Sequence, residues 1–297
     1  MWVLVVAIAV TLTIVIALAS ARARSIPRVM HQTHGVPFHE LPGVFKRNAR
    51  RLIRENPTFE YRYYSARDCE AFIRSRYGEE MLSIYLSIDP AYGPARSDLF
   101  RYMLLYEEGG VYFDMKSGPN VPLDQIIRPN DSYLLSNWCG GECGRANWDA
   151  LVKTGFGEYQ QWWIACAPRH PFLRAVISQC VRNIDAYVHT TSPSTFGKLG
   201  VLALTGPIAY TRAIHPLVEA RSASFRFVPR SLGGAVTYNR TGVDHAKVYA
   251  SHYSTLRTPI VTPLKTRNRK TRKTEKDLNK STPFNGPKTP GVFLSTD

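Results

Sequence analysis

The sequence predicts an α/β fold with a mostly parallel sheet and flanking helices, formed as one domain by residues 25–262. Strand-like and helix-like segments alternate along this region, and we see no internal repeat. Such alternation is typical of parallel sheets covered by helices. A chain of 297 residues, 44% of them hydrophobic, can also bury one large core.

The first predicted elements are a strand and a helix. Residues 26–34, IPRVMHQTH, have the composition of a strand that ends in polar residues. Residues 66–78, ARDCEAFIRSRYG, have the pattern of an amphipathic helix, and we expect it to stop near Gly78.

A helix and a strand form the centre of the predicted domain. Residues 95–110, ARSDLFRYMLLYEEGG, place apolar side chains on one face and end at Gly109, a favourable helix C-cap. Residues 111–113, VYF, have strand composition. Asp114 therefore follows the carboxyl end of a buried strand, where open α/β sheets bind their ligands.

Two charged residues of the preceding helix accompany Asp114. Asp98 and Arg101 are three residues apart, so both side chains can face the same side of the helix. A surface ion pair of little energetic value is the simpler interpretation of the two residues taken alone.

The ends of the chain differ from the domain. Residues 2–19 carry no charge and are about long enough to cross the hydrocarbon of a bilayer, so we expect residues 1–24 to be a membrane anchor or a signal segment, with the anchor favoured. Arg22 and Arg24 follow it, which would place the domain in the cytoplasm and leaves the topology open. Residues 263–297 form a basic tail that we expect to be disordered and solvated.

Cysteines and N-glycosylation sequons bear on whether the domain lies in an oxidising lumen. Cys139 and Cys143 could form a local disulfide in an oxidising lumen, although buried thiols are an equal alternative. Sequons at Asn130, Asn239 and Asn279 permit glycosylation there. The domain lacks an evident aromatic and basic array, so no nucleic-acid partner is expected.

Taken together, these motifs are more specific than any one alone. The stretch SDLFRYMLLYEEGGVYFDMK, residues 97–116, resembles the central signature of glycosyltransferase family 32, which includes initiating α-1,6-mannosyltransferases and inositol-phosphoceramide mannosyltransferases. Residues 26–34, 56–73 and 201–214 resemble its opening strand, its second strand and helix, and its Thr-Gly-Pro segment. The resemblance implies a single Rossmann-like GT-A domain that binds a nucleotide sugar at its strand ends.

Site residues follow from this resemblance position by position. Asp98 is expected to hold the donor, Arg101 to lie near the sugar hydroxyls, and Asp114, the first Asp of the Asp-x-Asp motif, to contact the ribose or the donor sugar. Gly109 and Gly110 match the Gly-Gly of the pattern and join the donor-binding set. Lys116 occupies the place of the second Asp, which in the family carries the divalent metal.

The lysine at this position leaves open whether the chain uses a divalent metal. Mn²⁺ or Mg²⁺ could still be held by Asp114 with His252, which lies where many GT-A enzymes have a C-terminal His, although a core or surface histidine explains His252 equally well. An ammonium cannot hold a metal, but it can meet a diphosphate oxygen directly. Our hypothesis is that Lys116 takes over some or all of the metal's role, so that transfer could also be independent of metal.

The remaining candidates carry weaker signals. Glu158 is assigned to the reactive face of the donor sugar or to the acceptor, as is Gln161, and polar residues on a helix surface beside buried tryptophans are the alternative. Thr205, Gly206 and Pro207 are expected to form a turn beneath the donor site. The last two candidates, at the end of the first strand, could flank the nucleotide base or simply pack in the core: His31 and Gln32.

The sequence therefore predicts a membrane-associated, single-pass glycosyltransferase, with an ER or Golgi type of lumen favoured. It would move a hexose, with mannose favoured over galactose or glucose, from a GDP- or UDP-sugar to a glycan or glycolipid acceptor, with retention of configuration. The alternative is a catalytically inactive protein that binds sugar nucleotides or glycans. A basic membrane tether acting through the tail is the poorest fit, because the tail lacks hydrophobic anchoring residues.

Overall fold

The computed structural model describes residues 25–138, 157–187, 196–243 and 253–262. A six-stranded sheet with the order β2-β1-β3-β6-β5-β7 forms the centre. Its strands are β1 (Val29–Thr33), β2 (Glu60–Tyr64), β3 (Gly110–Phe113), β5 (Tyr133–Leu135), β6 (Trp163–Cys166) and β7 (Arg226–Phe227). Strands β1, β2 and β3 are mutually parallel, as are β5 and β7, whereas β6 runs antiparallel to both of its neighbours. The mostly parallel α/β sheet is confirmed, with an antiparallel strand that the sequence did not predict.

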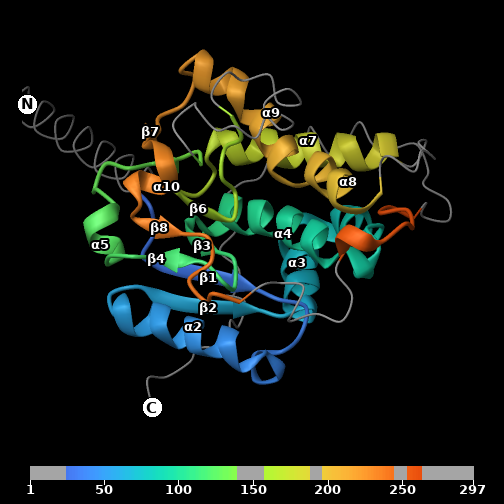
Figure 1. The fold of residues 1–297 in the computed structure, drawn as a ribbon. Helices are drawn as coiled ribbons and strands as arrows, with labels where there is room; N and C mark the ends of the chain where they lie inside the picture. The colour runs from blue at the N-terminus through green and yellow to red at the C-terminus, as the bar shows by residue number, and fades with distance from the viewer. Residues whose placement is uncertain (1–24, 139–156, 188–195, 244–252, 263–297) are drawn as a thin grey trace, which may run out of the picture.

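Helices cover both faces of the sheet. They are α2 (Gly43–Glu55), α3 (Ala66–Leu86), α4 (Gly93–Glu108), α5 (Leu123–Ile126), α7 (Pro171–Tyr187), α8 (Gly197–Leu204), α9 (Pro207–Glu219) and α10 (Pro229–Gly233). Single 3-10 turns lie at Phe38–Glu40, Pro90–Tyr92 and Tyr253–Thr255. A small antiparallel ribbon pairs β4 (Gly118–Pro119) with β8 (Val236–Thr237). In Figure 1, α2 lies below strands β1 and β2, while α4, α7 and α8 lie above them.

Two hydrophobic cores follow from the alternation of side chains along the strands. Val111 and Phe113 of β3 pack into the core on the side of α2, whereas Tyr112 packs into the larger core formed with α3, α4, α7, α8 and α9. Because successive side chains of a strand point to opposite faces, Asp114 returns to the α4 side. The period of two therefore directs this carboxylate toward helix α4.

The end of α4 is built around two glycines. Gly109 caps the helix with φ 63°, and Gly110 opens β3 with φ 94°. A Cβ on Gly109 would lie 2.7 Å from Pro168, and one on Gly110 would lie 2.6 Å from the carbonyl oxygen of Val29. The predicted C-cap is confirmed, and this sharp reversal lays the first turns of α4 beside the carboxyl end of β3.

Helix α3 extends beyond its predicted range. Its N-terminus carries a capping box, in which Ser65 accepts from the Asp68 backbone N–H and Asp68 accepts from that of Ser65. The expected stop near Gly78 is confirmed in the backbone, because Gly78 is non-helical, with φ 80° and ψ 179°, and separates two helical stretches of α3; helical structure then resumes to Leu86. The apolar residues Met81, Leu82 and Tyr85 bury themselves in the core beyond the kink, which favours continuation.

The predicted attachments, residues 1–24 and 263–297, lie outside the described residues, as do Cys139, Cys143 and Asn279. Within the described ranges, no helix combines the length and apolar character that crossing a membrane requires. Cys69, Cys166 and Cys180 are buried free thiols.

Candidate functional site

Asp114 stands immediately after β3, at the predicted edge of the sheet. Its backbone N–H donates to the carbonyl of Trp162 at 2.8 Å, and its carbonyl accepts from Gln32 Nε2 at 3.1 Å. These two bonds fix the backbone on both sides, whereas the side chain keeps 27% of its surface exposed. The carboxylate is therefore held in place and still open to a ligand.

Arg101 connects this carboxylate to helix α4. Its guanidinium lies 3.0 Å from Asp98 Oδ1 and 3.1 Å from Asp114 Oδ1, and it donates to Oε1 of Gln161 at 2.6 Å and to the Gln161 carbonyl at 2.9 Å. The Arg101 side chain is only 4% exposed. One buried cation therefore bridges two carboxylates, which gives the cluster a formal charge of −1 when both are ionised.

Asp98 lies deepest in the cluster. Besides Arg101, it accepts hydrogen bonds from Gln161 Nε2 at 3.1 Å and from Thr205 Oγ1 at 3.3 Å. Burial raises the pKa of Asp98 to about 7, against the lowering effect of Arg101. The interpretation of Asp98 and Arg101 as a surface ion pair is wrong, since both side chains are buried.

An aromatic ring completes the setting of Arg101. The guanidinium lies 4.6 Å from the ring centroid of Tyr112, whose hydroxyl donates to Asp114 Oδ1 at 3.4 Å. Burial opposes the charged form of Arg101, but the negative charge of Asp114 and its neighbours raises the pKa of Arg101 overall, so this residue is a permanent cation. The stacking and the two ion pairs leave the guanidinium little freedom to reorient.

Lys116 lies in the turn that follows Asp114. Asn48 of α2 donates from Nδ2 to the carbonyls of Met115 at 2.9 Å and Ser117 at 3.0 Å, which clamps the turn on both sides of the lysine. The ammonium stands 3.8 Å from the ring centroid of Tyr238, and the residue is 7% exposed. Asn48 and Tyr238 were missed in the sequence, because both act from distant segments.

Two tyrosines approach the carboxylates from the C-terminal part of the chain. Burial and the negative charge of Asp114 raise the pKa of Tyr238, and burial with the charges of Asp98 and Asp114 raises the pKa of Tyr253 to about 12. Both phenols therefore stay protonated at neutral pH and can act as hydrogen-bond donors. Tyr253 is adjacent to His252, so the stretch SHYSTLR contained a usable signal for this tyrosine as well.

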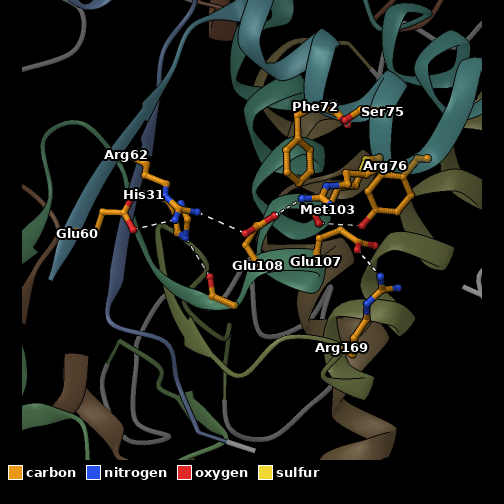
Figure 2. A network of polar contacts seen from close by, with 12 residues as sticks. His31, Glu60, Arg62, Phe72, Ser75, Arg76, Met103, Glu107, Glu108 and Arg169 are labelled. Carbon is orange, nitrogen blue, oxygen red and sulfur yellow. Dashed lines mark hydrogen bonds and ion pairs between the residues drawn. The ribbon is translucent and has the colours of Figure 1, made fainter. Parts of the chain in front are cut away.

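His31 belongs to another part of the molecule. Its Nε2–H donates to the Gly109 carbonyl at 3.0 Å, burial lowers its pKa to about 3, and its surface is fully buried. Figure 2 shows it beside a network in which Glu108 accepts from Arg62 at 3.4 Å and from Arg76 at 2.9 Å. The core-packing alternative therefore describes His31, at the opposite end of β3 from Asp114.

Several other predicted site residues support the backbone and the carboxylates of the site. Gln32 is fully buried and orients the Asp114 backbone, and Gly109 and Gly110 act in close packing. Gly206 links α8 to α9, which confirms the predicted turn at Thr205–Pro207, and Thr205 bonds to Asp98.

The segment of Glu158 and Gln161 is not helical. It is an extended approach to β6 that pairs Tyr159 with Asn137, so the helix-surface interpretation is wrong. Glu158 accepts from Trp138 Nε1 at 3.1 Å and is partly exposed, whereas Gln161 is 8% exposed and bonds to both Asp98 and Arg101. His252 lies outside the described residues.

A divalent cation such as Mg²⁺ or Mn²⁺ requires several oxygen ligands, and the described side chains around Asp114 offer few of them. Asp114 offers one partly exposed carboxylate, while Asp98 is enclosed by its hydrogen-bond donors. The second motif position presents the ammonium of Lys116, and no group of three or more His, Cys, Asp or Glu suited to a metal occurs among the described residues. These side chains alone do not fit a dedicated divalent metal site.

The motif residues fall within the range that a sequence-family model matches. Residues 42–133 match the model described as "Glycosyltransferase sugar-binding region containing DXD motif". This range includes Asp98, Arg101, Asp114 and Lys116. The resemblance to glycosyltransferase family 32 is confirmed.

Curated relatives agree with this family 32 resemblance. The chain is 24% identical over 199 residues to the "Initiation-specific alpha-1,6-mannosyltransferase" of Schizosaccharomyces pombe, covering 64% of this chain and 48% of that protein. It is 31% identical over 184 residues to "Inositol phosphoceramide mannosyltransferase 3" of the same yeast, covering 62% and 43%. The chain spans about half the length of the curated relatives that it matches.

A solved structure identifies the fold. The UDP-bound glycosyltransferase domain from the YGT toxin aligns with a TM-score of 0.50 at 9% identity, over 73% of this chain and 81% of that domain. This likeness, with the topology described above, confirms the predicted GT-A fold.

Proposed function

We propose that this chain is a glycosyltransferase that moves a hexose from a nucleoside-diphosphate sugar to a glycan or glycolipid acceptor. The observation that carries the proposal is the bridge from Arg101 to Asp98 and Asp114 at the carboxyl end of β3. Mannose is the favoured hexose, because the curated relatives are named mannosyltransferases. GDP- and UDP-sugars are both candidate donors, with galactose and glucose as the less favoured hexoses.

The carboxylates recognise the donor in this proposal. Ionised Asp114 accepts hydrogen bonds from ribose or sugar hydroxyls, since its side chain is partly exposed. Arg101 orients Asp114 and compensates the buried charge of Asp98. Because the cluster is already held together by Gln161 and Thr205, the donor would meet a largely preorganised site.

Lys116 supplies positive charge for the leaving group. Breaking the bond between the sugar and the diphosphate builds negative charge on the phosphate oxygens, and stabilising that charge is the main electrostatic task of catalysis. The ammonium on the second motif position meets a diphosphate oxygen directly and takes over some or all of the role of Mn²⁺ or Mg²⁺.

Chelation tests this part of the proposal. Transfer from GDP-mannose to a synthetic acceptor should persist at a substantial level in EDTA, and a Lys116→Gln variant should lose most of it. Complete loss of wild-type turnover in chelator, with recovery on adding Mn²⁺, would show that the lysine does not replace the metal.

Retention of anomeric configuration is the proposed stereochemistry. Positive charge develops on the sugar in an oxocarbenium-like transition state, and carboxylates or amides close to it stabilise that charge. Glu158, which is partly exposed beside Trp138, is the proposed group on the reactive face. Proton NMR of the first product formed would display the α-anomer from an α-linked donor, whereas the β-anomer would contradict retention.

A binding protein without turnover is the second candidate, motivated by the ammonium in the position of a metal-binding carboxylate. Thermal shift with a panel of GDP- and UDP-sugars, with and without Mn²⁺, identifies the donor under either function, because a ligand of the folded state raises its stability. Stabilisation without release or transfer of sugar would favour the binding protein.

For the enzyme we further propose attachment to a membrane, facing an ER or Golgi type of lumen.

A further inference from the structure

Tyr238 is joined to the turn of Lys116 through the backbone. The antiparallel ribbon pairs Gly118 with Thr237, and Ser117 Oγ donates to the Tyr238 carbonyl at 2.7 Å. On the far side of Tyr238, the N–H of Arg240 donates to the Lys116 carbonyl at 2.8 Å. These contacts place the two residues opposite each other on adjoining segments that are far apart in sequence.

The side chains meet as a cation over an aromatic face. Lys116 Nζ lies 3.8 Å from the Tyr238 ring centroid, although 39% of Tyr238 is exposed. Trp138 and Trp162 contact the same ring edge to face, each with 5.4 Å between centroids. The low-polarity surroundings strengthen the attraction between ammonium and ring.

The chain enters this arrangement through an unusual turn. Arg230, Ser231 and Leu232 have φ values of 58°, 54° and 57°, the left-handed region that side chains other than glycine rarely adopt. Gln160 Nε2 donates to Ser231 Oγ at 2.7 Å, and Leu232 N–H donates to Ser136 Oγ at 3.1 Å. A strained conformation persists only where its surroundings determine it, and this one leads directly into β8 and Tyr238.

We propose that Tyr238 is a positioning residue for Lys116: the tyrosine ring holds the ammonium at the turn that follows Asp114, so that the ammonium can meet the donor diphosphate. The inference rests on the proposed function for its ligand, but the hold of the ring on the lysine is independent of any ligand. Tyr238 acts through its aromatic face, so the hydroxyl is dispensable for this role.

The first measurement needs no donor. In the full chain, the modification rate of Lys116 by an amine-reactive reagent is followed by peptide mass spectrometry. Tyr238→Leu should raise this rate about two- to thirtyfold, the range that the strength of a cation–π contact implies. Tyr238→Phe should stay within about twofold of wild type. Phe227→Leu is the matched control, since Phe227 is also an exposed ring, at 38%.

The second measurement is the Kd for the nucleotide sugar found by thermal shift. Tyr238→Leu should weaken binding about two- to thirtyfold and Tyr238→Phe should not. In the Lys116→Gln background, Tyr238→Leu should add little, because the ammonium that the ring holds is gone. If the leucine variant folds poorly, Tyr238→Gln replaces it, and we expect the same effects on the Lys116 modification rate and on the Kd.

Two results would overturn the inference. Equal Lys116 reactivity in Tyr238→Leu, Tyr238→Gln and wild type would mean that the ring does not hold the ammonium. Faster modification of Lys116 in Tyr238→Phe, or weaker binding of the nucleotide sugar by this variant, would assign the effect to the hydroxyl instead. If no sugar nucleotide binds, the proposed function fails, while the reactivity series still decides the role of Tyr238.

Discussion

Replacing Arg101 by methionine tests the charge arrangement at the centre of the site. Methionine keeps much of the side-chain length but removes the guanidinium. Among the described residues, this is the cation that forms ion pairs with both Asp98 and Asp114. Loss of one partner from a buried ion pair costs about 3–5 kcal/mol, because the remaining charge stays desolvated. At pH 8 we therefore expect a fall of that size in the free energy of unfolding, measured by urea denaturation.

The pH dependence gives this prediction its sign. Burial raises the pKa of Asp98 from 3.8 to about 7, so its contribution to stability is fully present below 3.8 and is lost as pH rises through about 7. Without Arg101 this pKa rises further, and the protonated carboxyl no longer needs a cation at pH 5. The difference between variant and wild type should consequently shrink by up to about 1.4 kcal/mol for each pH unit as the pH falls toward 7, and stay constant below 7, where Asp98 is protonated in both proteins.

Asp98→Asn supplies the matched control. The amide has the same shape and no charge, so adding it to the Arg101→Met variant should restore part of the stability at pH 8 and flatten the pH dependence. A cost below about 1 kcal/mol for Arg101→Met, or an equal cost at pH 5 and pH 8, would refute the reasoning.

Further predictions concern the fold and the tail. Gly109→Ala should cost more stability than Gly233→Ala, since both have φ near 63° but only the first Cβ meets a neighbour, at 2.7 Å; equal thermal shifts would contradict this. His31→Gln should reduce acid sensitivity, because the depressed pKa of about 3 makes the histidine's contribution present above pH 6.5 and lost as pH falls; an unchanged slope of unfolding free energy between pH 6.5 and 4 would argue against it. Deleting residues 263–297 should leave turnover intact, and a collapse of turnover would assign the tail a larger role.

The sequence predicted the parts of the site that depend on local pattern. A helix C-cap at Gly109, the short strand after it and a carboxylate at the strand end are all encoded within a few residues. The period of the helix also brought Asp98 and Arg101 together. What these local rules could not give was their burial, which depends on segments that arrive later in the chain.

The contacts that were missed all act across long separations. Gln161 was a candidate in the sequence, but its bonds to Arg101 and Asp98 are made from the segment that approaches antiparallel strand β6, and local pattern gave no sign of them. Asn48 and Tyr238 hold the Lys116 turn from a helix and a ribbon far away in sequence. His31 lies in the middle of β1 rather than at its end, and its side chain contacts the Gly109 carbonyl, as the core-packing alternative expected.

Release of hexose from the nucleotide sugar tests the central claim most directly. A transferase leaks some sugar to water, so the wild-type chain should liberate free hexose from the donor that stabilises it, and Asp114→Asn should stop this release while the chain remains folded. Equally slow release by the wild type and by Asp114→Asn would contradict enzymatic transfer at this site.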